Sequence, residues 1–167
     1  MVGTKKIVIL NGTNEEDIYQ FADCAIKTSE NVIYHSILDG VKHIAHLAQV
    51  HYPSKDSEKD QRLVDELVSV FDEYCDLSFE RFTEILSGYF MIDDLDHVFI
   101  YTKYPKLEER FIEYSRQKGY DIHSLFIESG KSSTTLSNKT SFDTIITNNG
   151  SLEDLMEHTI KYICGRE

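Results

Sequence analysis

The sequence has no tryptophan, and it is poor in proline, glycine and cysteine. Two prolines and 8 glycines among 167 residues are too few for a collagenous, disordered or low-complexity chain. Three widely spaced cysteines, Cys24, Cys75 and Cys164, fit neither a zinc-binding spacing nor a disulfide framework, so we expect reduced thiols. Without tryptophan, the tyrosines and phenylalanines are expected to be the main anchors of the core.

Long apolar runs and positive charge are also scarce. No apolar run reaches about 18 residues, and Met1 to Leu10 does not have the features of a signal peptide. We therefore expect a cytoplasmic protein with no membrane partner. Lysine and arginine number 17 against 29 aspartates and glutamates, which gives a net charge of −12. Such a surface repels phosphate backbones and argues against a nucleic-acid partner.

Short apolar runs alternate with longer amphipathic stretches, which predict strands and helices in turn. The expected strands are Lys6 to Asn11, Asn31 to Ser36, Asp96 to Tyr101, Tyr120 to Ile127 and Asp143 to Thr147. The expected helices are Glu15 to Thr28, Ile37 to Val50, Ser57 to Tyr74, Ser78 to Phe90, Glu108 to Lys118 and Ser151 to Tyr162. The alternation indicates one α/β domain over residues 1–167, with helices on both faces of a parallel sheet.

Signals at the helix ends support these boundaries. Thr13 and Glu16 have the spacing of a capping box at the first helix. Pro105 suits a first helical turn, and Gly119 is placed to end the same helix. Ligands of parallel α/β sheets bind at the carboxyl ends of the strands, so the loops that follow the strands are where a site is expected.

The segment after the first strand stands where a phosphate-binding loop would lie. Such a loop reads G-x-x-x-x-G-K-[ST], and its backbone amides and lysine wrap the phosphates. Gly12 supplies the first glycine, but Asp17, Ile18 and Tyr19 occupy the places of the second glycine, the lysine and the hydroxyl residue. The acids at positions 15–17 would repel a triphosphate. Two interpretations stay open: an ordinary helix start favoured by the helix dipole, or a surviving anion or nucleotide site.

Four stretches of the chain together carry a family pattern. They are Lys6 to Asp23 (strand, glycine loop and helix), Tyr34 to Ala45 with Leu38-Asp39-Gly40-Val41-Lys42, Val98 to Pro105, and Thr144 to Leu155 with its Asn-Asn-Gly-Ser turn. In this order they resemble the P-loop nucleoside monophosphate kinases, nearest to the phage-type deoxynucleoside monophosphate kinases, with a degenerate Walker A loop. The resemblance implies a five-stranded parallel sheet in the order 2-3-1-4-5.

The resemblance also implies site residues. Those implied for substrate binding are Asp39, Lys42, Arg62 and Lys103, and those implied for nucleotide binding are Gly12, Asn148 and Gly150. Lys103 stands where the family has the arginine of D-x-R, and Tyr101 stands in place of its acid. A lysine keeps the charge of that arginine but loses its bidentate geometry. No catalytic residue follows from the pattern.

Neither histidines nor acids complete a metal site. His43 and His46 share a helix face, and Asp93, Asp94 and Asp96 precede a strand, but the further ligands of a metal centre are missing. No metal is therefore expected. An apolar stripe through Leu63, Leu67 and Phe71 predicts either core packing or a face for a protein partner or a homodimer.

Three functions stay open. The first is a degenerate deoxynucleoside monophosphate kinase-like protein that binds a mononucleotide or a protein partner without ordinary ATP-dependent phosphoryl transfer. The second is an active nucleotide kinase with rearranged phosphate contacts, which would use ATP and magnesium and would bring Lys42, Arg62 and Lys103 to one pocket. The third is an α/β protein-interaction module with no nucleotide role.

Overall fold

A parallel sheet forms the centre of the computed structural model, which describes residues 5–37, 39, 41–44, 47, 57–92, 95–102, 105–130 and 142–165. Its strands are β1 (Lys6–Gly12), β2 (Val32–Ser36), β3 (His97–Tyr101), β4 (Asp121–Ser129) and β5 (Thr144–Asn148). The five strands run parallel in the order β2-β3-β1-β4-β5. This order is the one that the family resemblance implies, and all the expected strands are confirmed.

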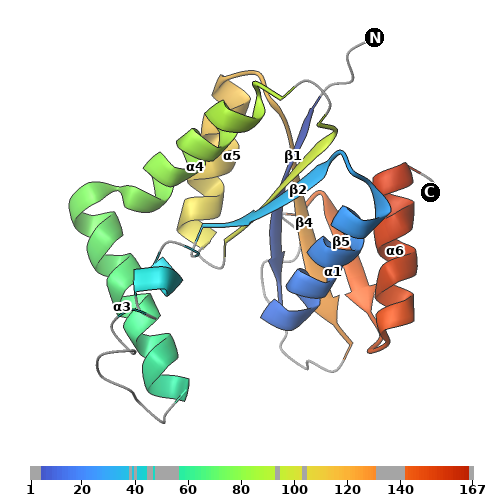
Figure 1. The fold of residues 1–167 in the computed structure, drawn as a ribbon, viewed down its shortest axis with the longest axis horizontal. Helices are drawn as coiled ribbons and strands as arrows, with labels where there is room; N and C mark the ends of the chain where they lie inside the picture. The colour runs from blue at the N-terminus through green and yellow to red at the C-terminus, as the bar shows by residue number, and fades with distance from the viewer. Residues whose placement is uncertain are drawn as a thin grey trace.

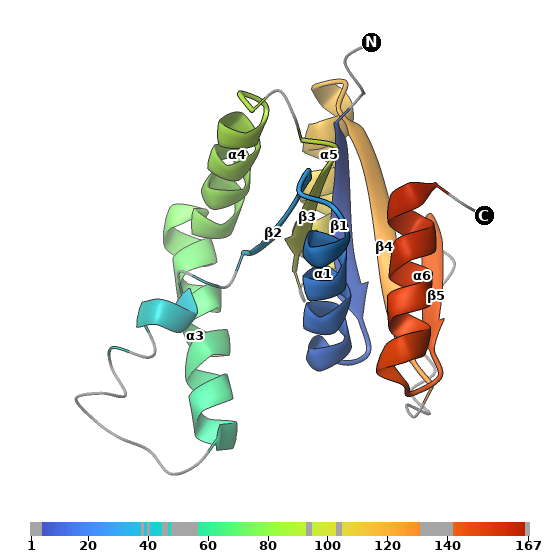
Figure 2. The same ribbon diagram turned by 45° about the vertical axis from the view of Figure 1, so that its right-hand side comes forward.

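Helices cover both faces of the sheet, as Figures 1 and 2 show. They are α1 (Glu15–Thr28), α3 (Ser57–Cys75), α4 (Leu77–Tyr89), α5 (Pro105–Gln117) and α6 (Leu152–Cys164). Half of the expected helix Ile37 to Val50 lies outside the described residues, and positions 39, 41–44 and 47 are helical. Of the described helices, none is long and apolar enough to cross a membrane.

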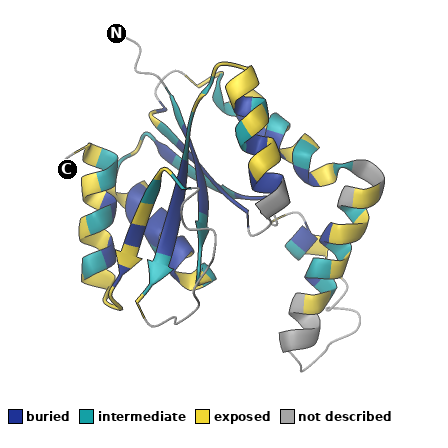
Figure 3. Ribbon diagram, turned by 180° about the vertical axis from the view of Figure 1, so that it is seen from behind, coloured by how far each residue is buried: buried dark blue, intermediate teal, exposed yellow. Residues whose placement is uncertain are grey.

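Successive side chains of β1 point to opposite faces of the sheet and contribute to one hydrophobic core on each face. Val8 and Leu10 pack with Phe21 of α1 and Leu155 of α6. Ile7 and Ile9 belong to the other cluster, on the opposite face, which contains the following side chains of α4 and α5: Phe82, Ile85, Leu86, Leu107 and Phe111. Figure 3 shows the resulting band of buried residues along the strands. Four phenylalanines, Phe21, Phe82, Phe99 and Phe111, are the largest of the fully buried side chains, and isoleucines and leucines make up the rest of that set.

The helix α3 packs apart from these two cores. Val41, Val64 and Val68 form a small cluster of their own, with the partly buried side chains of Leu63, Leu67 and Phe71 against it. Figure 2 shows α3 standing away from the sheet. The apolar stripe predicted from the sequence is therefore partly core, while Val70 remains 48% exposed.

The start of α1 differs from the sequence prediction by one residue. Asn14, not Thr13, is the N-cap, and its side chain accepts a hydrogen bond from the Glu16 amide. The Thr13 hydroxyl instead accepts a hydrogen bond from the Ser129 amide at 2.7 Å. Asparagine and threonine are both good N-cap residues. Because the Thr13 hydroxyl is bonded to β4, Asn14 is the N-cap. The other two signals are confirmed, since α5 starts at Pro105 and ends just before Gly119, which adopts a φ of +73°.

Candidate functional site

The carboxyl ends of the neighbouring strands β1 and β3, at Gly12 and Tyr101, mark the place where the chain connections diverge, and we call this place the crevice. These neighbouring strands are followed by helices on opposite faces, because α1 packs in one core and α5 in the other. Parallel α/β sheets bind ligands where the connections diverge in this way. The crevice is therefore the place to test the residues predicted for the site.

The connection from β1 to α1 is short and closed on itself. Only Thr13 and Asn14 lie between the strand and the helix. The Gly12 amide donates to the Asn11 side chain at 2.8 Å, and the Thr13 amide donates to the Ile127 carbonyl of β4 at 3.0 Å. With Glu16 bonded to the cap, these amides have partners within the chain.

Gly12 serves the packing of this connection. A Cβ atom at this position would lie 2.5 Å from the Ile127 carbonyl oxygen and 3.2 Å from the Ile18 side chain. Ile18 itself is only 1% exposed. The residue that stands at the lysine position of a phosphate loop is thus part of the core beneath Gly12.

Lys42 reaches from its own helical segment to the first turn of α1. Its ammonium donates to Glu15 Oε1 at 2.6 Å and to the Tyr19 hydroxyl at 2.7 Å, and it lies 5.3 Å from the centre of the Tyr19 ring. Burial acts to lower the pKa of Lys42, but the bonds to Glu15 and Tyr19 outweigh it and raise that pKa. The ammonium is therefore held charged beside the crevice.

Three tyrosines form the wall next to Lys42. The Tyr19 ring meets the rings of Tyr34 and Tyr101 edge to face, at centroid distances of 5.9 and 6.1 Å. Burial raises the pKa of both Tyr34 and Tyr101, and the neighbouring Tyr19 adds to the effect at both. Asp39 raises the pKa of Tyr34 further, and Glu15 that of Tyr101. The phenols of Tyr34 and Tyr101 stay neutral, but Tyr101 is only 3% exposed and the Tyr34 hydroxyl is buried. Of the three rings it is that of Tyr19, 36% exposed, that faces solvent.

Asp39 and Arg62, two further residues predicted for the substrate side, have contacts of their own. Asp39 accepts a hydrogen bond from the Ser36 amide at 3.3 Å, which fixes the turn after β2. Arg62 pairs with Glu66 on its own helix at 3.3 Å, and its side chain is 80% exposed. Lys103 lies outside the described residues. The convergence of Lys42, Arg62 and Lys103 thus stays a prediction.

The residues predicted for nucleotide binding lie at the same edge of the sheet. Asn148 ends β5 and is buried, and its side-chain amide donates to Asp17 Oδ1 of α1 at 3.0 Å. Its side-chain carbonyl accepts from the Gly150 amide, where the chain turns with a φ of +101°. Both polar ends of Asn148 therefore brace the turn against α1.

A buried carboxyl group that the sequence prediction missed lies in the crevice. Glu108, in the first turn of α5, is 7% exposed and accepts a hydrogen bond from the Asn11 side chain at 2.9 Å. Burial raises the pKa of Glu108, and the bond from Asn11 opposes that shift. An acid in a first helical turn is a common feature. What sets Glu108 apart is its contact with the end of β1, which is distant in sequence.

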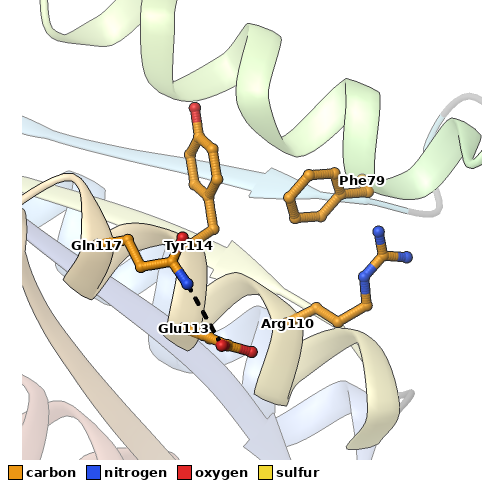
Figure 4. Close-up of a pocket in the computed structure, with 5 residues that line it drawn as sticks. All are labelled: Phe79, Arg110, Glu113, Tyr114 and Gln117. Carbon is orange, nitrogen blue, oxygen red and sulfur yellow. Dashed lines mark hydrogen bonds between the residues drawn. The ribbon is translucent and has the colours of Figure 1, made fainter.

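A shallow hollow lies between α4 and α5, as Figure 4 shows. Its volume is about 190 Å³, and its lining residues are Phe79, Arg110, Glu113, Tyr114 and Gln117. Arg110 is engaged with Asp76, and Gln117 donates to Glu113 at 3.3 Å. Within the described part of the chain, no three histidine, cysteine or acidic side chains come together to hold a metal ion.

Comparison with known proteins identifies the fold. No family model and no curated protein matches this chain. Its structure is similar to that of the APS kinase CysC of Mycobacterium tuberculosis, solved as a cysteine-to-alanine mutant, with a TM-score of 0.50. The match covers 98% of this chain and 99% of the kinase, at 11% sequence identity. The chain therefore has a P-loop kinase-like α/β fold.

Proposed function

We propose that this chain is a degenerate nucleoside monophosphate kinase-like protein, nearest to the phage-type deoxynucleoside monophosphate kinases, that binds a mononucleotide without ordinary ATP-dependent phosphoryl transfer. The observation that carries the proposal is Lys42. Its ammonium is held charged at the crevice by Glu15 and Tyr19, while the loop expected to hold ATP is closed on itself.

The closed loop supports the loss of the triphosphate site. A working phosphate loop offers free backbone amides and a lysine. Here the amides of Gly12, Thr13 and Glu16 donate within the chain, and Ile18 is in the core. The acidic first turn of α1 adds repulsion for a triphosphate, because Glu15, Glu16 and Asp17 all stand there.

The pairing of Lys42 supports binding of a phosphate monoester. Glu15 gives Lys42 the anionic partner that a ligand phosphate would otherwise supply. A phosphate dianion carries more charge than a carboxylate, so it can replace Glu15 beside the ammonium. The ring of Tyr19, 36% exposed, lies next to Lys42 and offers aromatic surface to a base or a sugar.

The first test is a thermal-shift panel of deoxynucleoside and nucleoside mono-, di- and triphosphates, with and without magnesium. A ligand at 100 times its dissociation constant adds about 2.7 kcal/mol of stability, which raises the unfolding midpoint visibly. We expect monophosphates to raise it and triphosphates with magnesium to have no larger effect. A larger shift with a triphosphate and magnesium would contradict the closed donor loop.

Three substitutions sharpen this test, and two of them lie in one helical turn. Glu15→Gln releases Lys42 and should tighten mononucleotide binding about 2- to 5-fold, the range expected from a partly exposed ion pair. Glu16→Gln is the matched control, since the Glu16 side chain accepts a hydrogen bond from Gln20 on the same helix, and we expect no change in affinity. Lys42→Met should weaken binding at least about tenfold. Isothermal titration calorimetry measures all three, and equal affinities would refute the role of Lys42.

An active kinase is the second candidate, and Glu108 is the observation that favours it. Its buried carboxyl group, with a raised pKa, stands in the crevice where a base for an acceptor hydroxyl would be useful. A coupled assay for ADP release with ATP, magnesium and each monophosphate tests this candidate. Turnover that Lys42→Ala abolishes would replace the binding proposal. A panel without any thermal shift would instead direct the search to a protein partner.

A further inference from the structure

Three basic side chains meet at the amino end of the sheet, far from the crevice. Lys6 starts β1 and pairs in register with His97 of β3, and His123 of β4 pairs with Val8, two residues further along β1. Because side chains alternate along a strand, Lys6, His97 and His123 point to the face where Val8 packs with α1 and α6.

The last turn of α6 covers this cluster with Tyr162. The ring centre of Tyr162 lies 5.2 Å from Lys6 Nζ, 6.4 Å from the His97 ring and 6.1 Å from the His123 ring. The same ring packs on Phe99 and Phe21 of the core. Tyr162 thus fastens the end of α6 directly over the two histidines.

Two polar atoms under this cover are buried without a hydrogen-bond partner in the described structure, His97 Nδ1 and the Tyr162 hydroxyl. A neutral imidazole can leave one ring nitrogen as an unused acceptor. A protonated imidazole carries an N–H on both nitrogens, and a buried N–H without an acceptor is costly. Because His97 Nδ1 meets no acceptor in the described structure, protonation of His97 is disfavoured in the docked state.

Some of the charges around His97 and His123 lower the pKa values of these histidines, and others raise them. Burial lowers the pKa of His97, the charge of Lys6 lowers it further, and Asp96 and Asp121 oppose them. For His123, burial and Lys6 again lower the pKa, against Asp143 and Asp121. Asp143 is also engaged elsewhere, since it accepts hydrogen bonds from the Ser124 amide and hydroxyl at 2.7 and 2.8 Å. The net effect lowers the pKa of both histidines below the ordinary 6.5 while Tyr162 is docked, even though Asp143 Oδ2 lies 4.0 Å from His123 Nδ1.

We propose that the His97–His123 cluster is an acid-sensitive latch, which releases the last turn of α6 from the sheet when these histidines take up protons. Both histidines are half-buried beside Lys6 in the docked state. In the released state both rings are fully hydrated, which favours their charged forms. The proposal does not depend on nucleotide binding, because the latch lies at the opposite end of the strands.

Proton linkage gives the direction in which a change of pH shifts the balance between the docked and the released state. A released histidine has a pKa near 6.5, and the docked histidines have lower values. Above about pH 6.5 both states are neutral and docking is fully favoured. As the pH falls below that value, the released state binds more protons than the docked state. The equilibrium then shifts toward the released state, by about tenfold for each unit of difference between the histidine pKa values of the two states.

Hydrogen exchange of the full chain, at about pH 7.5 and about pH 5.5, tests the latch. Protection factors, corrected for the intrinsic effect of pH, should fall for amides 159–165 and stay constant in α4 and α5. A uniform change over the whole chain, or none in this segment, would overturn the proposal. NMR titration of the His97 and His123 rings should give midpoints below 6.5 that coincide with changes at amides 159–165. Midpoints at or above that value would refute the latch.

Variants distinguish a pH-dependent release of the end of α6 from a contact that has only a structural role. His97→Phe keeps an aromatic ring on Phe99 but cannot be protonated, so it should reduce the acid-induced loss of protection. His43→Gln is the matched control, because His43 is exposed on another segment, and its pH response should equal that of the unmodified chain. If His97→Phe retains the full pH response, His97 is not part of the latch. Should the variant not fold, the NMR titration of the unmodified chain decides.

Discussion

Gly12 shows how a single residue can suggest a function and yet be required for packing. The sequence pattern makes it the first glycine of a phosphate loop, but its Cβ position is blocked by the Ile127 carbonyl at 2.5 Å. We predict that Gly12→Ala lowers the free energy of unfolding by about 1–3 kcal/mol, because backbone atoms must move apart. Urea unfolding followed by circular dichroism measures this change.

Gly88 is the matched control for that substitution. It lies within α4, and a Cβ atom there would meet nothing within 4 Å. Gly88→Ala should therefore stabilise the protein by about 0.5–1 kcal/mol, since alanine loses less entropy in a helix. Equal effects of the two substitutions would contradict the close approach of β1 and β4 at Gly12.

At the scale of elements, an ion pair between Asp76 and Arg110 stabilises the junction between α3 and α4. Asp76 has a left-handed backbone with a φ of +51°, and its carboxylate accepts two hydrogen bonds from Arg110 of α5, at 2.6 and 2.8 Å. Arg110 also lies over the Phe79 ring at 4.4 Å. The pair therefore ties the start of α4 to α5.

Acid should weaken this junction. The hydrogen bonds from Arg110 lower the pKa of Asp76 below its ordinary 3.8. The stabilisation is complete above that ordinary value and is lost as the pH falls through the lower, folded-state pKa. Asp76→Asn tolerates the left-handed backbone but removes the charge. We predict lower stability at neutral pH and a smaller loss between about pH 4 and pH 2, measured by urea unfolding at each pH.

A surface pair serves as the control for Asp76. Asp23 pairs with Lys27 one turn away, and both side chains are largely exposed, at 60% and 72%. Exposed pairs of this kind contribute little to stability. Asp23→Asn should leave the unfolding curve nearly unchanged, and an effect as large as that of Asp76→Asn would mean that the α3–α4 junction has no special role.

At the scale of the whole molecule, α3 is the least anchored of the described helices. Its apolar contacts form the small cluster around Val41, Val64 and Val68, whereas α1, α4, α5 and α6 pack on the sheet. We predict that amides of α3 exchange with solvent faster than those of β1 and β4, because local opening exposes less apolar surface there. Hydrogen exchange at neutral pH measures this, and equal protection would contradict it.

The sequence predicts the architecture well because the strands are short, continuous apolar runs. The family resemblance adds the strand order. The site is harder to predict, since its decisive contacts join residues distant in the chain. Lys42 meets Glu15 across 27 positions, and Asn11 meets Glu108 across 97 positions. Thr13 shows the same limit, because its hydroxyl is drawn to Ser129 and leaves the capping role to Asn14.

The sheet order also has a consequence for synthesis on the ribosome. β1 is the central strand, yet both of its neighbours come much later in the chain, with Lys6 opposite His97 and Asp121. At about 5–20 residues per second, the ribosome needs several seconds to deliver them. During that interval the stretch Ile7–Val8–Ile9–Leu10, fully buried in the finished protein, has no sheet to join. The nascent chain must be shielded by the tunnel, by α1 or by a chaperone until β3 and β4 emerge.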